Sequence, residues 1–119
     1  MSSRAWLFRI SDIINAIDKT EKYISGMTFA QFKKHDMTVD AVIRNLEVIG
    51  EAANAIPKSV KLKYPEIPWK LMSGMRNILI HEYFGVDVST VWQTAKKNLP
   101  SVKKNLVAIL EESTPHSSS

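Results

Sequence analysis

The chain has 119 residues, 45% hydrophobic and 24% charged, with a formal net charge of +4, which fits one globular domain and is compatible with a nucleic-acid partner. The absence of cysteine excludes disulfides and thiolate metal ligands. No long apolar core follows the start of the chain and no apolar run reaches the ~20 residues that cross a bilayer, so we expect no signal peptide, no membrane partner and a cytoplasmic location.

The first predicted helix covers residues 4–25, where apolar side chains recur at intervals of three and four. Gly26 then offers a stop, because glycine readily adopts the backbone conformation that ends helices. Residues 28–32 are predicted to form a short helical turn that places two phenylalanine rings in the core. The clearest helical period of the chain follows at residues 39–56 and ends before Pro57.

The segment PKSVKLKYPEIPW, residues 57–69, is predicted to be a connector. Its three prolines exclude a long helix, although residues 59–64 have room for one or two helical turns. Pro68 suits the first turn of a third helix over residues 69–84, and Gly85 ends that helix.

A fourth helix is predicted to begin at a cap formed by Asp87 or Ser89 and to continue through Ala95. Pro100 interrupts its pattern, which predicts a kink or a new helix start there. The apolar stripe continues to Leu110, and no stretch has the pattern of a β-strand.

These elements predict an all-α protein, an antiparallel up-and-down bundle of four to five main helices. We expect a single helical domain over residues 1–112. Residues 113–119 are low in hydrophobicity and are predicted to form a disordered tail.

The predicted third helix contains RNILIHEYF, in which Arg76, Asn77, His81 and Tyr83 interrupt an apolar stretch. On a straight helix Arg76 and Tyr83 lie within roughly 20° of each other, whereas Arg76 and His81 lie roughly 140° apart. Arg76 and His81 can therefore meet in two ways. The helix can loosen at His81, or two chains can bring two copies of the segment together across a two-fold axis.

These residue types suit the cleavage of a phosphodiester. The planar cation of Arg76 matches phosphate oxygens, and His81 can accept or donate a proton near neutral pH. The 2′-hydroxyl of RNA supplies a nucleophile, and the sequence shows no clustered metal-ligand set. The more common interpretation of an arginine and a histidine near a helix end is structural, as caps, ion pairs or core residues.

The motif R-N-x-x-x-H-x-Y at residues 76–83 resembles that of the HEPN superfamily, specifically its HepT-like branch. Three longer segments resemble the same branch in the same order: TVDAVIRNLEVIGEAANAIP (38–57), YPEIPWKLMSGMRN (64–77) and VWQTAKKNLPSVKKNL (91–106). The resemblance covers roughly residues 12–110. The long combination is specific, and the short motif alone is less so.

The resemblance implies a homodimer with the motif at its interface cleft, and a metal-independent endoribonuclease. It implies the toxin of a type VII-like toxin–antitoxin pair, of the kind in which a minimal nucleotidyltransferase (MNT) antitoxin uses ATP to transfer AMP to the motif tyrosine. Arg76 and His81 would be catalytic without a cofactor, and Asn77 would position them. Tyr83 would be the AMPylation site and a possible substrate contact.

A polar stripe of Arg44, Glu47 and Glu51 lies opposite the apolar face of the second predicted long helix. Such a stripe is usually a solvated face, but Arg44 or Glu47 could instead line the active cleft and orient Arg76 or His81. Small residues at positions 50, 53 and 54 either reduce bulk in the core or let a second chain approach closely.

Two further hypotheses from another class remain open at this point. The chain could be a non-catalytic helical partner that binds a nucleotidyltransferase or a nucleotide. A weaker option is a subunit that passes a small substrate to that enzyme. The intact pair of Arg76 and His81 favours the ribonuclease, because a binding module has no need of both.

Overall fold

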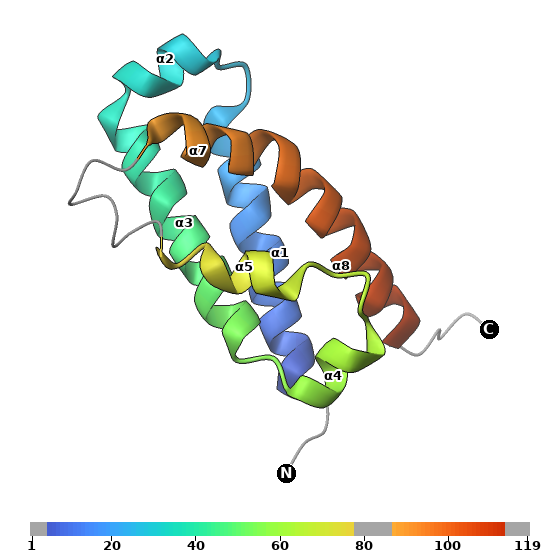
Figure 1. The fold of residues 1–119 in the computed structure, drawn as a ribbon. Helices are drawn as coiled ribbons and strands as arrows, with labels where there is room; N and C mark the ends of the chain where they lie inside the picture. The colour runs from blue at the N-terminus through green and yellow to red at the C-terminus, as the bar shows by residue number, and fades with distance from the viewer. Residues whose placement is uncertain (1–4, 78–86, 114–119) are drawn as a thin grey trace.

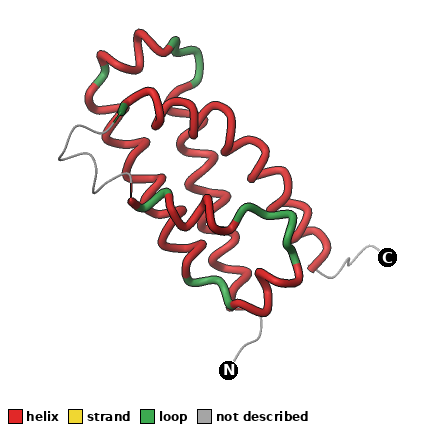
Figure 2. Tube along the Cα trace, viewed as in Figure 1, coloured by secondary structure: helices red, strands yellow, loops and turns green. Residues whose placement is uncertain are grey.

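The computed structural model describes residues 5–77 and 87–113. Regular structure in these ranges is entirely helical, which confirms the predicted all-α class (Figures 1 and 2). The elements are α1 (Ala5–Ile24), α2 (Phe29–Lys34), α3 (Asp36–Asn54), α4 (Lys58–Lys63), α5 (Trp69–Gly74), α7 (Val88–Gln93), the π-helix η1 (Thr94–Asn98) and α8 (Leu99–Ser113). Helix α1 packs against α3 and α8 and runs antiparallel to both. In the described ranges, no helix is long and apolar enough to span a bilayer.

The core lies between α1, α3 and α8, where the periodic apolar residues of all three helices meet. Side chains that are wholly buried there include Ile10, Ile13 and Ile17 of α1, Val42, Leu46 and Ile49 of α3, and Leu99 and Leu106 of α8. Their spacing of three, four and seven residues places each set on one helix face. The predicted apolar stripes are therefore the faces that the protein buries.

The end of α1 and the short helix α2 close one end of the bundle. Gly26 has a φ of +77°, a conformation that side-chain-bearing residues rarely adopt, and so confirms the predicted stop. Phe32 is completely buried, with its ring centroid 5.0 Å from that of Trp92. Phe29 is only partly buried but also packs on Trp92, at 6.0 Å between ring centroids. The predicted pair of phenylalanine rings thus anchors α2 to the start of the C-terminal arm.

Side chains satisfy the free N–H groups at the starts of α2 and α3. Thr28 and Gln31 form a capping box, in which the Gln31 backbone N–H donates to Thr28 Oγ1 at 3.2 Å and the Thr28 N–H donates to Gln31 Oε1 at 2.9 Å. The Thr38 N–H donates to His35 Nδ1 at 3.3 Å at the start of α3. The capping box fixes the start of α2, and the cap from His35 lies in the turn between α2 and α3.

Asp87 caps α7, as predicted. Its Oδ1 accepts the Ser89 backbone N–H at 3.0 Å and the Ser89 hydroxyl at 2.7 Å, and Oδ2 accepts the Thr90 hydroxyl at 3.4 Å. The hydrogen bonds from Ser89 hold the pKa of the Asp87 carboxylate below its usual value of 3.8, because they stabilise the ionised form.

The chain then passes from α7 through η1 into α8 without leaving a helical path. Pro100 has no backbone N–H, and its ring would collide with the carbonyl group of Lys96 in a regular α-helix. The π-helix over Thr94–Asn98 widens the turn immediately before it, and α8 starts at Leu99. The predicted irregularity at Pro100 is therefore confirmed.

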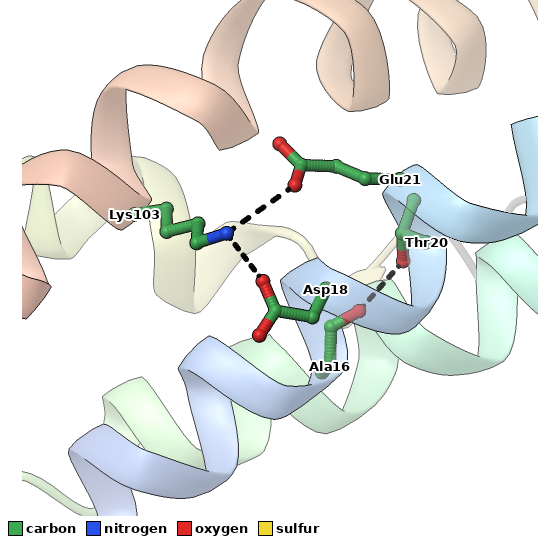
Figure 3. A network of polar contacts seen from close by, with 5 residues as sticks. All are labelled: Ala16, Asp18, Thr20, Glu21 and Lys103. Carbon is green, nitrogen blue, oxygen red and sulfur yellow. Dashed lines mark hydrogen bonds and ion pairs between the residues drawn. The ribbon is translucent and has the colours of Figure 1, made fainter. Parts of the chain in front are cut away.

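A polar link joins α8 to α1 on the solvent side of the core. Lys103 Nζ lies 2.6 Å from Asp18 Oδ1 and 3.6 Å from Glu21 Oε1 (Figure 3). The hydrogen bond to Asp18 raises the pKa of Lys103 above its usual 10.5, and Glu21 adds a smaller effect. On the same stretch of α1, the buried Thr20 hydroxyl donates to the Ala16 carbonyl at 2.9 Å.

The prediction of one continuous third helix over residues 69–84 is wrong. Helix α5 ends at Gly74, and the backbone N–H of Met75 donates to the Met72 carbonyl at 3.0 Å, which closes a tight last turn. Arg76 lies in the turn that follows, so the helix breaks before the motif and not first at His81. Residues 78–86 lie outside the described ranges, and with them the predicted end at Gly85.

Candidate active site

Arg76 is held by an ion pair to α3. Its Nη1 donates to Glu51 Oε1 at 2.9 Å. The two side chains remain 42% and 63% exposed, so solvent reaches the pair. Arginine carries several further N–H donors, and one bond to a carboxylate leaves others free for phosphate oxygens.

The backbone of Arg76 also lies directly against α3, at the buried residue Gly50. A Cβ atom added to Gly50 would lie 2.5 Å from Arg76 N and 2.8 Å from Arg76 Cβ, much closer than real Cβ atoms approach other atoms. The glycine therefore makes room for a residue of the same chain. The sequence left open whether the small residues of this helix reduce bulk within the chain or admit a second chain. At Gly50, the close neighbour is Arg76 of the same chain.

Beside the pair lies a solvent-open hollow of about 490 Å³ between α1 and α3. Its charged lining consists of Arg9, Asp12, Lys19, Arg44, Glu47 and Glu51, together with polar Asn15 and Asn45. Glu51 belongs both to this lining and to the Arg76 pair. The hollow therefore shares Glu51 with the Arg76 pair, and its lining carries three cations and three anions together with apolar Ala16, Val48 and Ala52.

The predicted supporting residues Arg44 and Glu47 both line this hollow, and they approach each other at 4.0 Å. The hydrogen-bond partner that the structure gives Arg76 is instead Glu51, one turn further along α3. Asn77 follows Arg76 and is exposed. Glu51 belongs to the polar stripe that the sequence predicted. The stripe alone did not indicate which of its members contacts Arg76.

His81 and Tyr83 lie in residues 78–86 and so outside the described ranges. Their predicted roles therefore stay predictions. Across the described residues, no group of three or more histidine, cysteine, aspartate or glutamate side chains has the arrangement of a metal site.

Comparison with known proteins identifies the family. A family model described as "Ribonuclease HepT-like" matches residues 13–109. A Methanocaldococcus jannaschii protein named "Putative RNase" is 46% identical over 101 residues, which cover 85% of this chain and 87% of the relative. "Probable ribonuclease HepT" of Thermococcus cleftensis is 47% identical over 94 residues, covering 79% and 86% respectively.

No solved structure matches the chain significantly. The sequence relatives nevertheless align over most of their own lengths, so the likeness extends well beyond the short motif. The matched region contains α3, the Arg76 turn and most of α8, together with the predicted motif residues. The predicted family and enzyme class, a ribonuclease, are thereby confirmed. The chain belongs to the HepT-like ribonuclease family.

Proposed function

We propose that the chain is a metal-independent endoribonuclease toxin with Arg76 and His81 as its catalytic residues. The observation that carries this proposal concerns Arg76. Its guanidinium is held by Glu51 at 2.9 Å, its side chain remains 42% exposed, and Glu51 also lines the neighbouring hollow. A structural arginine at the surface needs no such neighbouring space. A phosphate-binding arginine needs both a fixed direction and access.

In this proposal Arg76 acts on the scissile phosphate. The 2′ oxygen of the RNA attacks phosphorus, and the bond from phosphorus to the 5′ oxygen breaks. Negative charge on the non-bridging oxygens increases in the transition state, where a fixed cation stabilises it more strongly than in the bound substrate. The products are a 2′,3′-cyclic phosphate and a 5′-hydroxyl end.

His81 moves the proton in this reaction. As a neutral imidazole it takes the proton from the 2′-hydroxyl, and as an imidazolium it gives one to the departing 5′ oxygen. Asn77 and a second chain are the proposed means of bringing the two motif residues to one phosphate, since a homodimer places two copies of the motif in one cleft.

The hollow between α1 and α3 supports RNA as the substrate. Arg9, Lys19 and Arg44 can contact phosphates next to the scissile one, and the carboxylates can accept hydrogen bonds from base amino groups. The three anions balance the three cations, so the hollow would not bind every polyanion through net charge alone. In this proposal the charged lining of the hollow binds the RNA, and Glu51, which belongs to that lining, also holds Arg76.

We propose that an MNT-type antitoxin silences the enzyme through Tyr83. The tyrosine oxygen attacks the α-phosphorus of ATP, AMP is transferred, and pyrophosphate leaves. The added phosphodiester carries negative charge into the motif that contains Arg76, where it competes with RNA phosphate for the guanidinium. ATP is then a substrate of the antitoxin and no cofactor of the nuclease.

The test is chemical and uses two matched oligonucleotides in the presence of EDTA. One is entirely RNA, and the other carries a single 2′-deoxy nucleotide at the mapped cleavage position. We expect the first to be cut to a 2′,3′-cyclic phosphate end and the second to stay intact at that position. Equal cleavage of both, or cleavage that EDTA abolishes, would contradict the proposed mechanism.

A further inference from the structure

We propose that Gly50 and Glu51 are positioning residues that together aim Arg76 at the RNA phosphate; this inference rests on the proposed role of Arg76 in the ribonuclease. The two residues are neighbours on α3. One receives the backbone of Arg76 and the other receives its guanidinium.

Gly50 sets where the Arg76 backbone lies. A methyl group at this position would collide with Arg76 N, Cβ and Cα, at 2.5, 2.8 and 3.1 Å. The helix around Gly50 cannot easily retreat, because Leu46, Ile49 and Ala53 are wholly buried in the core. Arg76 lies in a turn after α5, so the displacement would fall on the arginine.

Glu51 sets where the side chain points. Its carboxylate binds Nη1 of Arg76 and leaves the other guanidinium nitrogens for a ligand. The Arg76 side chain is partly exposed and that of Glu51 largely so, and a solvent-accessible pair of this kind adds little to the stability of the fold. Its effect is to restrict a long, flexible side chain before RNA arrives, which lowers the conformational entropy lost on binding.

The chain supplies its own control for the glycine. Gly74, two residues before Arg76, would place an added Cβ in open space, with no atom within 4 Å. Gly50 lies in α3 and Gly74 in α5, and neither has a positive φ. An alanine is therefore compatible with the backbone at both positions. Gly50→Ala and Gly74→Ala thus add the same methyl group and differ in whether it meets Arg76.

The first experiment compares steady-state RNA cleavage by wild type, Gly50→Ala, Gly74→Ala and Arg76→Ala. Displacement of a catalytic group by about 1 Å can cost ~100-fold, so we expect Gly50→Ala to lose roughly 10- to 100-fold, mainly in kcat, and Gly74→Ala to match wild type. Equal activity of the two glycine variants would overturn the proposal.

Glu51 provides a second test that does not depend on room at Gly50. Glu51→Gln keeps the size and an acceptor oxygen but removes the charge, whereas Glu51→Asp keeps the charge. We expect Glu51→Gln to lower kcat at an unchanged melting temperature, and Glu51→Asp to recover part of the loss. Faster cleavage by Glu51→Gln would overturn the proposal, because it would mean that Glu51 withholds Arg76 from RNA.

A separate readout distinguishes failure of this inference from failure of the proposed function. Arginine side-chain NMR signals, with that of Arg76 assigned by its loss in Arg76→Ala, report the guanidinium whether or not RNA is cut. We expect the Arg76 signal to shift in Gly50→Ala and Glu51→Gln but not in Gly74→Ala. An inactive wild type with these shifts would refute the nuclease mechanism alone. An active wild type without them would refute the positioning role alone.

Discussion

The carboxylate of Glu51 accepts a hydrogen bond from Arg76 at 2.9 Å across 25 positions of sequence. The backbone of Arg76 packs against Gly50, the residue before Glu51. Two consecutive residues of α3 therefore hold one arginine, one at its backbone and the other at its guanidinium. The core helix that stabilises the fold therefore also determines the geometry of the candidate site. A change in α3 can alter cleavage without changing any group that touches RNA.

The hollow beside this pair gives a prediction for substrate binding. Arg44→Ala should raise KM for RNA and leave kcat nearly unchanged, because Arg44 would contact a neighbouring phosphate in ground state and transition state alike. The slope of log affinity against log salt should fall by about 0.7 if one phosphate contact is lost. Lys33→Ala, an exposed cation on α2 outside the hollow, is the control. A similar effect of both substitutions would show that only net charge matters.

Modification of Tyr83 gives a prediction for regulation. With antitoxin and ATP, mass spectrometry should show wild type gaining AMP-sized mass as cleavage is lost. Tyr83→Phe should gain no mass and stay active, since it lacks the acceptor oxygen. Tyr23→Phe, which changes a 40% exposed tyrosine on α1, should still be modified and silenced. Loss of modification in Tyr23→Phe with retention in Tyr83→Phe would place the acceptor elsewhere.

The core gives a prediction for stability. Leu46 is completely buried on α3, and Leu46→Ala should lower the free energy of unfolding by about 2–5 kcal/mol through lost burial and a residual cavity. Leu62 on α4 is 70% exposed, so Leu62→Ala should stay within about 0.5 kcal/mol of wild type. Denaturant unfolding followed by circular dichroism measures both. Equal effects would contradict the packing described for α1 and α3.

The cap of α7 gives a prediction for acid sensitivity. Asp87 has a folded pKa below 3.8, so its stabilising effect is complete above the unfolded value and is lost as pH falls through the lower folded value. The free energy of unfolding should therefore decrease as pH falls below 3.8. Part of this decrease should be absent in Asp87→Asn. A pH titration of the Ser89 amide signal by NMR reports this locally. An amide shift with a midpoint above 3.8 would contradict the hydrogen bonds assigned to Asp87.

The link between α1 and α8 gives the opposite dependence. Lys103 has a folded pKa above 10.5, so its contribution is complete below the unfolded value and is lost as pH rises through the folded one. Lys103→Met should weaken the alkaline dependence of unfolding, and Lys104→Met, at an exposed neighbouring position, should leave it unchanged. Identical alkaline profiles for wild type and Lys103→Met would contradict a role for the link.

Most of the fold was predictable because its determinants are local. The periods of α1 and α3, the cap at Asp87 and the irregularity at Pro100 all depend on residues within a few positions of each other. The end of α5 at Gly74 was not predicted. Residues 69–84 read as one continuous helix in local pattern, and the sequence does not show that Arg76 must fit against Gly50 of a distant helix.

The sequence predicted a chemistry for the candidate site, and the structure adds geometry that the sequence did not predict. The motif singled out Arg76, and the polar stripe of α3 singled out Arg44, Glu47 and Glu51, which the structure places around one hollow. Which carboxylate meets the arginine depends on the register between α3 and the turn after α5. That register follows from packing at Gly50, which no spacing rule within one helix can supply.

The most direct test of the central claim is the rate of RNA cleavage in EDTA by wild type, Arg76→Ala and His81→Ala, each shown to be folded and free of AMP by mass. We predict cleavage by wild type and a loss of at least about 100-fold in both variants, the scale expected when an electrostatic or acid–base group is removed. Cleavage by all three at similar rates, or by none, would contradict the assignment of Arg76 and His81 as the catalytic residues of a ribonuclease.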